Sequence, residues 1–528
     1  MNSNNEISHK VVDISTKKYI IQKTLSSGIA NVINGITSIS KDMILSRLLG
    51  SGAIMSAWFA STRIALIIKM ICADRALQIL TPIYNDIFKG KNTNLGKKKF
   101  GVYLLIMIFI ISIVGILVFS LTFLKPLLSN NSIKEIQLSL KLIPMATLYF
   151  MLVSLASSCV GILNFHGKYF LPALLVTIYN IVIISVIIIF HNMSPEEIVV
   201  KMNKFLVIAG ILQVLLITFL LIKVGQVPKF TTNIKFTLGT IKRRFGKTGL
   251  MACSGALINY LDRFNYIALF SGAYGISSLY YGGKLIHIPI MFSMWTLGNA
   301  LVVSMTRAFS DKRYYDLFNI LKYIMKLICH IAIPFSIILL MFKYQIINQL
   351  FGGYQFGEKS VYEVAKTMNI FVIKIPFECF LIATNLAFYA IKKSNVSILV
   401  ATIGIIINYA LSIILIFIVK MDHVGIIISS VSYTIISFII LQIILIKDYK
   451  EYYNGILWLI PTIIKSLLIS IISILITNQS YIYIINLTDT SRFYGGIALS
   501  ISIAIFIILY ITINTTINKF NCKIVIEN

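Results

Sequence analysis

The sequence predicts an all-α integral membrane protein with 14 transmembrane helices, built as two pseudo-symmetric six-helix lobes plus two C-terminal helices. Three observations predict this fold. Apolar segments of about 20 residues, enough to cross a hydrocarbon core roughly 30 Å thick, recur along the whole chain. Only 12% of the 528 residues are charged, whereas soluble domains carry about 25%. The positive charges gather in alternate loops between the apolar segments.

Each predicted span is an apolar stretch bounded by polar or charged residues. In chain order the spans lie near residues 20–40, 53–80, 100–124, 138–163, 170–190, 202–222, 247–270, 277–304, 317–342, 361–389, 395–418, 424–445, 455–476 and 493–512. These stretches leave no room for a separate soluble domain. We therefore expect one polytopic bundle.

Loop charge tests this arrangement independently of hydropathy, because Lys and Arg accumulate in short cytoplasmic loops. If the N-terminus is cytoplasmic, the basic loops all face the cytoplasm; they lie near residues 89–99, 223–244, 307–313, 392–393 and 447–450. The opposite loops 191–197 and 271–277 contain no Lys or Arg. This alternation predicts a multi-pass protein with both termini in the cytoplasm.

Two pairs of segments repeat at nearly the same offset. "DMILSRLLGSGA" from Asp42 is similar to "DRFNYIALFSGA" from Asp262, and "FHGKYFLPALLVTIYNIVIIS" from Phe165 is similar to "FYAIKKSNVSILVATIGIIIN" from Phe388. Both pairs link helices six apart, as in transporters built from two related halves. We therefore predict a cytoplasmic tail over residues 1–18, an N-lobe over 19–224 and a C-lobe over 225–446. Residues 447–528 then hold helices 13 and 14 and a cytoplasmic tail.

The sequence gives little support for an enzyme, a metal site or a nucleic-acid partner. It has no HExxH, GxSxG or Walker A pattern, and its six histidines are dispersed. Its six cysteines are scattered singly without CxxC spacing, which is typical of packing residues. The net charge of +28 is explained by the loops that orient the helices. We expect neither catalysis nor a cofactor.

Ionisable residues also lie within or at the edges of apolar segments, where each costs about 2.5 to 3.5 kcal/mol to insert at mid-bilayer. They are Lys41, Asp42, Arg63, Lys69, Asp74, Arg75, Asp262, Arg263, Lys284, Lys374 and Glu378. Lys374 and Glu378 are four residues apart and can neutralise each other on one helix face. The adjacent Asp–Arg pairs can bind partners on other helices.

The remaining cations are harder to explain by pairing. Asp42 can offset one charge among Lys41, Arg63, Lys69 and Lys284, so an excess of positive charge remains. In a transporter, buried cations favour an anionic substrate held midway across the membrane. Snorkelling of each side chain to the interface is the competing interpretation.

Three stretches carry a resemblance to a known family: "SKDMILSRLLGSGAIMSAWFA", "LVSLASSCVGILNFHGKYFLPALLVTIYNI" and "SSLYYGGKLIHIP". They are similar, in this order along the chain, to the patterns "ARDxxxAxxFGxGxxxDAFxxA", "xxSLxxxxxxxLNxxxxFxxPAxxPxxxNI" and "SxLYYADRLxxxP". These patterns are typical of the lipid II flippases, the MurJ or MviN family of the multidrug/oligosaccharidyl-lipid/polysaccharide (MOP) superfamily. Fourteen spans in two six-helix lobes plus two resemble the family architecture.

The resemblance implies export of the undecaprenyl-diphosphate-linked peptidoglycan precursor from the inner to the outer leaflet of the bacterial inner membrane. In the family, the lobes work by alternating access, a cationic central cavity holds the diphosphate, and helices 13 and 14 form a groove for the lipid tail. Membrane lipids and cell-wall synthesis proteins are the other partners that the resemblance implies.

The resemblance also assigns residues. Lys41 lies where the family has a helix 1 Arg, Asp42 at the neighbouring Asp, Lys284 at the helix 8 Arg, and Lys69 at or next to the helix 2 Arg. The predicted substrate-binding set is Lys41, Asp42, Arg63, Lys69, Asn164 and Lys284. No catalytic residue or metal ligand is predicted.

Three positions depart from the family pattern: Gly35 replaces an earlier helix 1 Arg, Ser56 a helix 2 Asp, and Gly283 the Asp of "YYADR". Lysine also lacks the planar fork with which arginine grips phosphate, although it remains a point charge. We therefore expect the same class of substrate in a divergent site.

Other functions stay open at this point. The chain could flip another lipid-linked glycan or export drugs in exchange for cations, as other members of the superfamily do. An exporter should rely on membrane carboxylates, which here are few and flanked by cations. A membrane scaffold of cell-wall synthesis that transports nothing is the third alternative.

Overall fold

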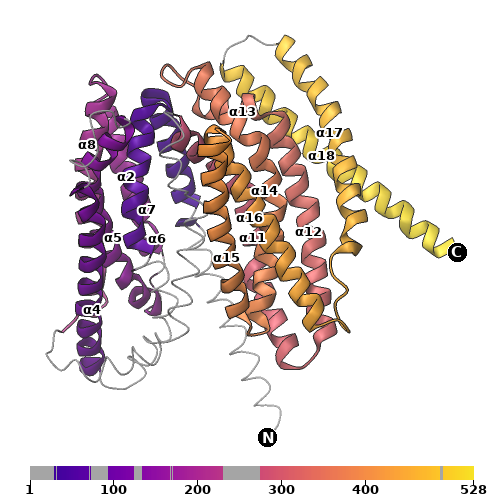
Figure 1. Ribbon diagram of the computed structural model, residues 1–528, viewed down its shortest axis with the longest axis horizontal. Helices are drawn as coiled ribbons and strands as arrows, with labels where there is room; N and C mark the ends of the chain where they lie inside the picture. The colour runs from indigo at the N-terminus through magenta and orange to yellow at the C-terminus, as the bar shows by residue number, and fades with distance from the viewer. Residues whose placement is uncertain are drawn as a thin grey trace, which may run out of the picture. The chain divides into compact units, whose positions relative to one another are not determined.

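The computed structural model describes residues 29–30, 32–70, 72, 93–123, 134–166, 168, 170–229, 274–487 and 492–527. Within these ranges the chain is largely helical and contains no strand. It divides into two compact units, each taken here by itself (Figure 1). The described part of unit 1 comprises residues up to 49 and from 53 to 229. That of unit 2 comprises residues 50–52 and everything from 274 onward.

Unit 1 is a bundle arranged around α5. Its elements are a helix over residues 32–49, α2 (Ala53–Lys69), α4 (Thr93–Ser120), α5 (Lys134–Phe165), the single turn α6 (Phe170–Ala173), α7 (Leu175–Ile189) and α8 (Pro195–Lys223). α5 packs against α2, α4 and α8, and α7 packs against α8 (Figure 1). The start of α8 is fixed locally, because Ser194 and Glu197 form a capping box around Pro195.

The first described helix is longer at its C-terminal end than the sequence predicts. The predicted span ends at residue 40, whereas the helix continues to residue 49, so Lys41 and Asp42 lie inside it. No proline or glycine interrupts residues 36–49. Gly50 ends the helix with a φ of 74°, a left-handed conformation that favours glycine. A Cβ at this position would lie only 2.6 Å from the Gln355 carbonyl oxygen, so the close approach also requires glycine.

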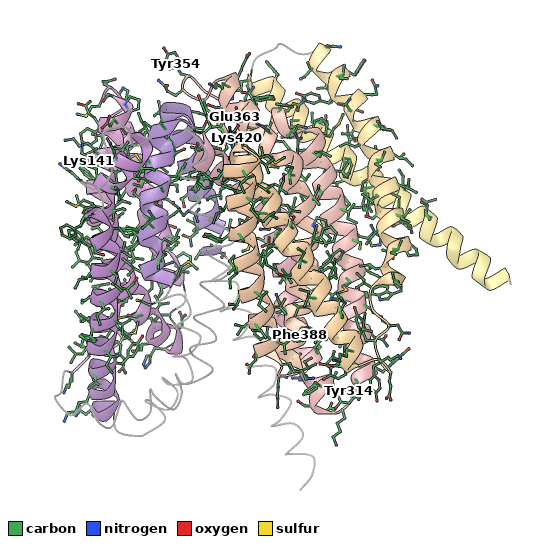
Figure 2. The ribbon with its side chains drawn as sticks, in the orientation of Figure 1. Lys141, Tyr314, Tyr354, Glu363, Phe388 and Lys420 are labelled. Carbon is green, nitrogen blue, oxygen red and sulfur yellow. The ribbon has the colours of Figure 1, made fainter. Side chains whose placement is uncertain are left out.

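Unit 2 is a second bundle, arranged around α14. Its elements are α11 (Gly275–Ser310), α12 (Tyr314–Met341), α13 (Lys343–Phe351), α14 (Glu358–Ala390), α15 (Ser394–Ile413), the π-helical turn η4 (Ile414–Ile418), α16 (Asp422–Asp448), the 3₁₀ turn η5 (Leu457–Leu459), α17 (Ile460–Leu487) and α18 (Arg492–Glu527). The sequence did not predict α13, because its nine residues are too few to span a membrane and five of them are polar or charged. Figure 2 labels Tyr354, Glu363 and Lys420 at one end of unit 2, and Tyr314 and Phe388 at the other.

The two units repeat one packing pattern. In unit 1, α5 contacts α2, α4 and α8, and α8 contacts α7. In unit 2, α14 contacts α11, α12 and α16, and α16 contacts α15. Among the described residues, α2, α4, α5, α7 and α8 of unit 1 thus correspond, in the same chain order, to α11, α12, α14, α15 and α16 of unit 2. Two related halves, predicted from short sequence repeats, require this correspondence. The last two helices stand outside it, with α17 packed on α12 and on α18.

The all-α membrane fold is confirmed, and the chain is a multi-pass membrane protein. In the described ranges, nine helices are long and apolar enough to cross a membrane. A described helix covers all or part of every predicted span except 247–270, which lies outside these ranges. The total of 14 spans and the lobe boundary after residue 224 stay predictions.

Candidate functional site

Lys41 and Asp42 form a buried ion pair in the middle of the helix over residues 32–49. The Lys41 ammonium nitrogen lies 3.2 Å from Asp42 Oδ1, and the two residues are only 4% and 2% exposed. The same ammonium lies 5.0 Å from the centre of the Tyr179 ring, within reach of a cation–π interaction. The structure therefore brings these two predicted site residues into contact.

A polar network fixes the helix that carries Lys41. Asn34 Nδ2 donates to the Ala173 carbonyl oxygen at 2.7 Å, and Asn34 Oδ1 accepts a hydrogen bond from the Thr177 hydroxyl. One turn further along, Asn180 Nδ2 donates to Thr37 Oγ1 at 3.2 Å. These contacts join the helix over residues 32–49 to α6 and α7, so Lys41 is held at the surface of α7.

Arg63 and Lys69 extend the cationic set along α2. Both are half-buried, whereas Ser56 on the same helix is 2% exposed. At a rise of about 1.5 Å per residue, Arg63 lies about 15 Å from the first residue of α2, near the middle of a span. Lys69 is the last residue of α2, and the chain continues as π-helix at residue 70.

In unit 2, Lys284 is the cationic candidate on α11. It lies about 14 Å along the helix from Gly275, is half-buried, and has its ammonium 5.7 Å from the centre of the Tyr280 ring. The two glycines before it differ in their surroundings. A Cβ on Gly282 would lie 2.5 Å from Thr367 Oγ1, whereas one on Gly283 would meet nothing within 4 Å.

The beginning of α11 is anchored to residues 50–52. The Ser277 hydroxyl donates to the carbonyl oxygen of Ser51 and lies 3.2 Å from that of Tyr274. Tyr281 lies in a buried aromatic cluster, with ring centres 4.8 Å from Phe351 and 5.4 Å from Phe356. These contacts fix the N-terminal turns of α11, and with them the position of Lys284.

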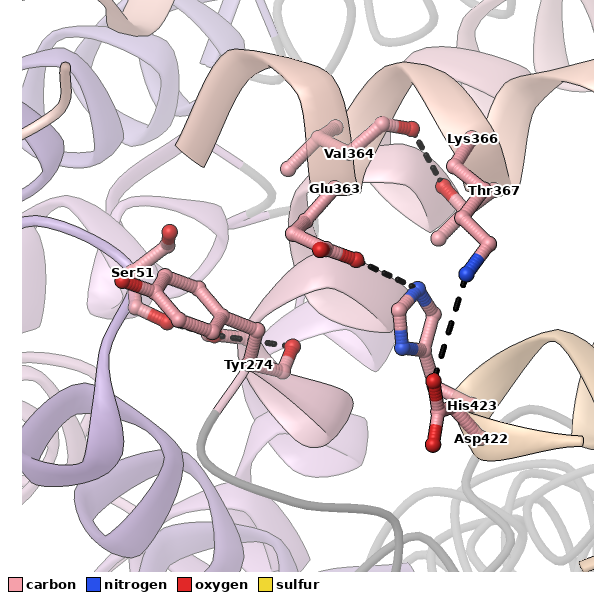
Figure 3. A network of polar contacts seen from close by, with 9 residues as sticks. Ser51, Tyr274, Glu363, Val364, Lys366, Thr367, Asp422 and His423 are labelled. Carbon is pink, nitrogen blue, oxygen red and sulfur yellow. Dashed lines mark hydrogen bonds and ion pairs between the residues drawn. The ribbon is translucent and has the colours of Figure 1, made fainter. Parts of the chain in front are cut away.

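Two charged contacts join α14 to α16, in the same close view as Ser51 and Tyr274 (Figure 3). His423 Nε2 lies 3.7 Å from Glu363 Oε2, and the Lys366 ammonium lies 4.0 Å from Asp422 Oδ2. Glu363 marks the end of unit 2 that also carries Tyr354 (Figure 2). These contacts tie the first turns of both helices together at that end.

The remaining charged candidates fall into two groups. Lys374 and Glu378 form the expected pair, with the ammonium 3.4 Å from Glu378 Oε2 and 2.7 Å from the Ser430 hydroxyl. This lysine therefore has a structural explanation. The second group lies outside the described residues and comprises Asp74, Arg75, Asp262 and Arg263.

Asn164 is half-buried in the last turn of α5. It lies in unit 1, as do Lys41, Asp42, Arg63 and Lys69, whereas Lys284 lies in unit 2. The sequence reasoning missed Tyr179, the aromatic neighbour of Lys41. It also missed the polar stripe of Asn34, Thr37 and Lys41, although the spacing of three and four residues is typical of one helix face.

A family model described as "Lipid II flippase MurJ" matches residues 45–494, which is most of the chain. The chain belongs to the MurJ family. The match includes Arg63, Lys69, Asn164 and Lys284 and begins just after Lys41 and Asp42. The MurJ family consists of transporters rather than enzymes.

Relatives named as probable lipid II flippase MurJ support this membership. The protein of Buchnera aphidicola subsp. Schizaphis graminum is 24% identical over 448 residues, which cover 83% of this chain and 84% of the relative. The protein of Aquifex aeolicus is 24% identical over 389 residues, covering 72% of this chain and 74% of the relative.

Solved structures share the fold. A structure of lipid II flippase MurJ in an inward closed conformation matches with a TM-score of 0.72 at 20% identity, covering 93% of this chain and 99% of that one. An inward-facing multidrug resistance MATE family transporter of the MOP superfamily matches with a TM-score of 0.62 at 12% identity, covering 79% of this chain and 96% of that one. At these identities, both matches concern the fold alone.

Proposed function

We propose that the chain moves lipid II, the undecaprenyl-diphosphate-linked peptidoglycan precursor, from the inner to the outer leaflet of the bacterial inner membrane. Membership of the MurJ family supports this substrate. The two lobes alternate in giving the substrate access to either side, and both termini lie in the cytoplasm. The repeated packing of the two units fits a transporter of this kind.

In this proposal Lys41, Arg63, Lys69 and Lys284 hold the diphosphate. The observation that carries this assignment is the lysine buried at 4% exposure in an apolar helix, Lys41, since a charge at this depth is expensive and is usually functional. Four of the six predicted site residues are cations, and one is an anion. A diphosphate is opposite in charge to this mostly cationic set.

The local sequence around Lys374 differs from that around Arg63, Lys69 and Lys284. Lys374 has Glu378 one turn away on its own helix. The residues one turn from Arg63, Lys69 and Lys284 include no Asp or Glu. The pairing of Lys374 thus follows from its own helix, whereas the local sequence offers no carboxylate at helical spacing at the other three positions.

The open surroundings of Gly35 and Gly283 support a divergent version of the family site. A Cβ at either glycine would meet no atom within 4 Å, so neither position is glycine because of crowding. A residue with a Cβ would be accepted at both positions. The chain therefore holds the substrate with fewer charged groups and relies on lysines as point charges.

Complementation of a bacterium depleted of its own lipid II flippase tests this function. The chain is expected to restore growth and rod or coccal shape. Membrane insertion of the full-length chain without any rescue would contradict the proposal and favour a scaffold role. Rescue of a strain lacking a different glycan flippase, or cationic dye efflux that requires Asp42 and Asp262, would favour the other two alternatives.

A further inference from the structure

A large polar pocket opens at the end of unit 2 that carries Tyr354. Its volume is about 970 Å³, and its walls come from α13, the first turns of α14, the end of α17, the beginning of α18, and Gly353, Phe356 and Gly357 between α13 and α14. This is the upper part of the range for small-molecule sites. None of the predicted diphosphate-binding residues lines it, so it is a separate site.

Contacts between the walls hold the pocket open. Arg492 Nη2 donates to the carbonyl oxygens of Asn348 at 2.6 Å and Gln349 at 2.9 Å, which ties α18 to α13. A Cβ on Gly496 would lie 2.5 Å from Gln349 Nε2, so these two helices approach closely. The Tyr481 ring of α17 packs edge-on against Phe342, with centres 5.4 Å apart. These contacts connect α17 and α18 to α13 and the residue just before it.

The lining combines flat aromatic rings with amides. Tyr344 and Tyr362 are 44% and 55% exposed and line the pocket together with Gln345. The side-chain Oε1 of Gln345 is buried and has no hydrogen-bond partner among the described residues. A buried amide oxygen normally accepts a hydrogen bond, so the acceptor capacity of Gln345 is not used among the described residues.

Charge at the pocket favours an anionic group on the ligand. Lys359 is exposed, lines the pocket, and has its ammonium 5.2 Å from the centre of the Tyr274 ring. It lies at the second position of α14, and the residue before this helix, Gly357, provides no side-chain cap. The exposed amides of an uncapped helix start also attract an anion. Glu358 is the acidic residue of the lining, and Arg492 is its second cation.

Sugars fit this combination of groups. The apolar face of a pyranose ring packs on tyrosine, while its hydroxyl and acetamido groups exchange hydrogen bonds with amide side chains. We propose that this pocket binds a carboxylate-bearing saccharide, namely the glycan–peptide head group of the lipid-linked substrate after it reaches the outer side. Two parts of this inference rest on the function proposed above: that the saccharide comes from the lipid-linked substrate, and that the pocket faces the outer side of the membrane. The pocket then acts as a second, exit-side site for the same substrate.

Direct binding tests the proposal. The probe is the water-soluble disaccharide–dipeptide of peptidoglycan, which lacks both diphosphate and lipid, titrated calorimetrically into the full chain in nanodiscs. Binding is expected, and Y344A and Y362A should each weaken it about tenfold, the loss of about 1.4 kcal/mol. The matched control is Y354A, which changes a tyrosine that is 97% exposed between α13 and α14 but absent from the lining. It should bind as the unmodified chain does.

A second comparison tests the role of charge. K359Q should weaken the anionic probe several-fold and leave binding of the neutral disaccharide N,N′-diacetylchitobiose unchanged. No binding of the anionic probe to the unmodified chain, or equal binding by Y344A, Y362A and Y354A, would overturn the proposal. If K359Q weakened binding of the anionic probe and of the neutral disaccharide equally, the proposal that the ligand carries a carboxylate would be overturned. Because the probe has no diphosphate, K41A should bind it normally, so this proposal and the flippase function can fail separately.

Discussion

Two buried lysines illustrate how the same side chain serves different purposes. Lys374 and Lys41 are both 4% exposed. Lys374 is satisfied by Glu378 at helical spacing and by the Ser430 hydroxyl. Lys41 is paired with the adjacent Asp42 and lies over the Tyr179 ring. We infer that a diphosphate, with its greater negative charge, competes with Asp42 for Lys41.

Restoring the acidic residue of the family pattern at position 283 tests the tolerance of the site. G283D is expected to insert and fold normally, because the position is open, and its carboxylate beside Lys284 should reduce flipping by competing with the diphosphate. G282D is the matched control, since its Cβ would lie 2.5 Å from Thr367 Oγ1. We expect it to lower Tm in a thermal-shift assay. A lowered Tm for G283D, or an unaffected G282D, would contradict this view of α11.

Some residue contacts could be predicted from the sequence, and others could not. The pair of Lys374 and Glu378 follows from a spacing of four on one helix, and it is confirmed. The position of Tyr179 under Lys41 depends on how α7 packs against another helix, which no local pattern records. The charge of Lys41 was therefore predictable, whereas its aromatic neighbour was not.

At the scale of elements, the helix over residues 32–49 depends on α7 through side-chain hydrogen bonds. Asn180, at 1% exposure, bridges to Thr37, and the Thr37 hydroxyl also lies 2.9 Å from the Ile33 carbonyl oxygen. Loss of a buried amide partner costs about 1 to 2 kcal/mol. The same hydrogen bonds also hold Lys41 in register with Tyr179.

We therefore expect N180A to lower the Tm of the purified protein, with T37V giving a similar decrease. The double variant should lose less than the sum of the two, because both changes remove one interaction. T402V is the control, since the Thr402 hydroxyl bonds to the Ile398 carbonyl oxygen of its own helix. Additive effects of N180A and T37V would show that the contact does not stabilise the protein.

Most elements were predictable because apolar length is a strong signal in membrane proteins. Two features could not be predicted from apolar length. The helix over residues 32–49 extends past its apolar run, since Lys41 and Asp42 neutralise each other and the stop comes from Gly50. α13 is too short and too polar to register as a span, yet it forms a wall of the saccharide pocket proposed above.

At the scale of the whole molecule, the packing of α2, α4, α5, α7 and α8 recurs in α11, α12, α14, α15 and α16. The sequence signalled this repetition only through two short matches, because packing constrains the size and spacing of side chains more than their identity. The alternation of positively charged and uncharged loops predicts which ends of the helices face the cytoplasm. That orientation stays a prediction.

Cysteine labelling in intact cells tests the orientation. Y354C should react with a membrane-impermeant maleimide added outside, whereas K392C should react only after the membrane is permeabilised. Both positions are exposed, and the native Cys72, Cys159, Cys329 and Cys379 are buried, so background labelling is checked with the parent chain. Labelling of K392C but not Y354C in intact cells would invert the topology.

The most direct test of the account measures lipid II accessibility at the outer leaflet in cells that depend on this chain. K41A and K284A are expected to insert normally and to abolish flipping, because each removes a cation that we propose holds the diphosphate. K41R and K284R should keep it, since arginine retains the charge and binds phosphate well. K326A, which changes an exposed lysine of α12, is the control and should transport normally. Unimpaired flipping by both K41A and K284A would contradict the central claim that these lysines bind the substrate.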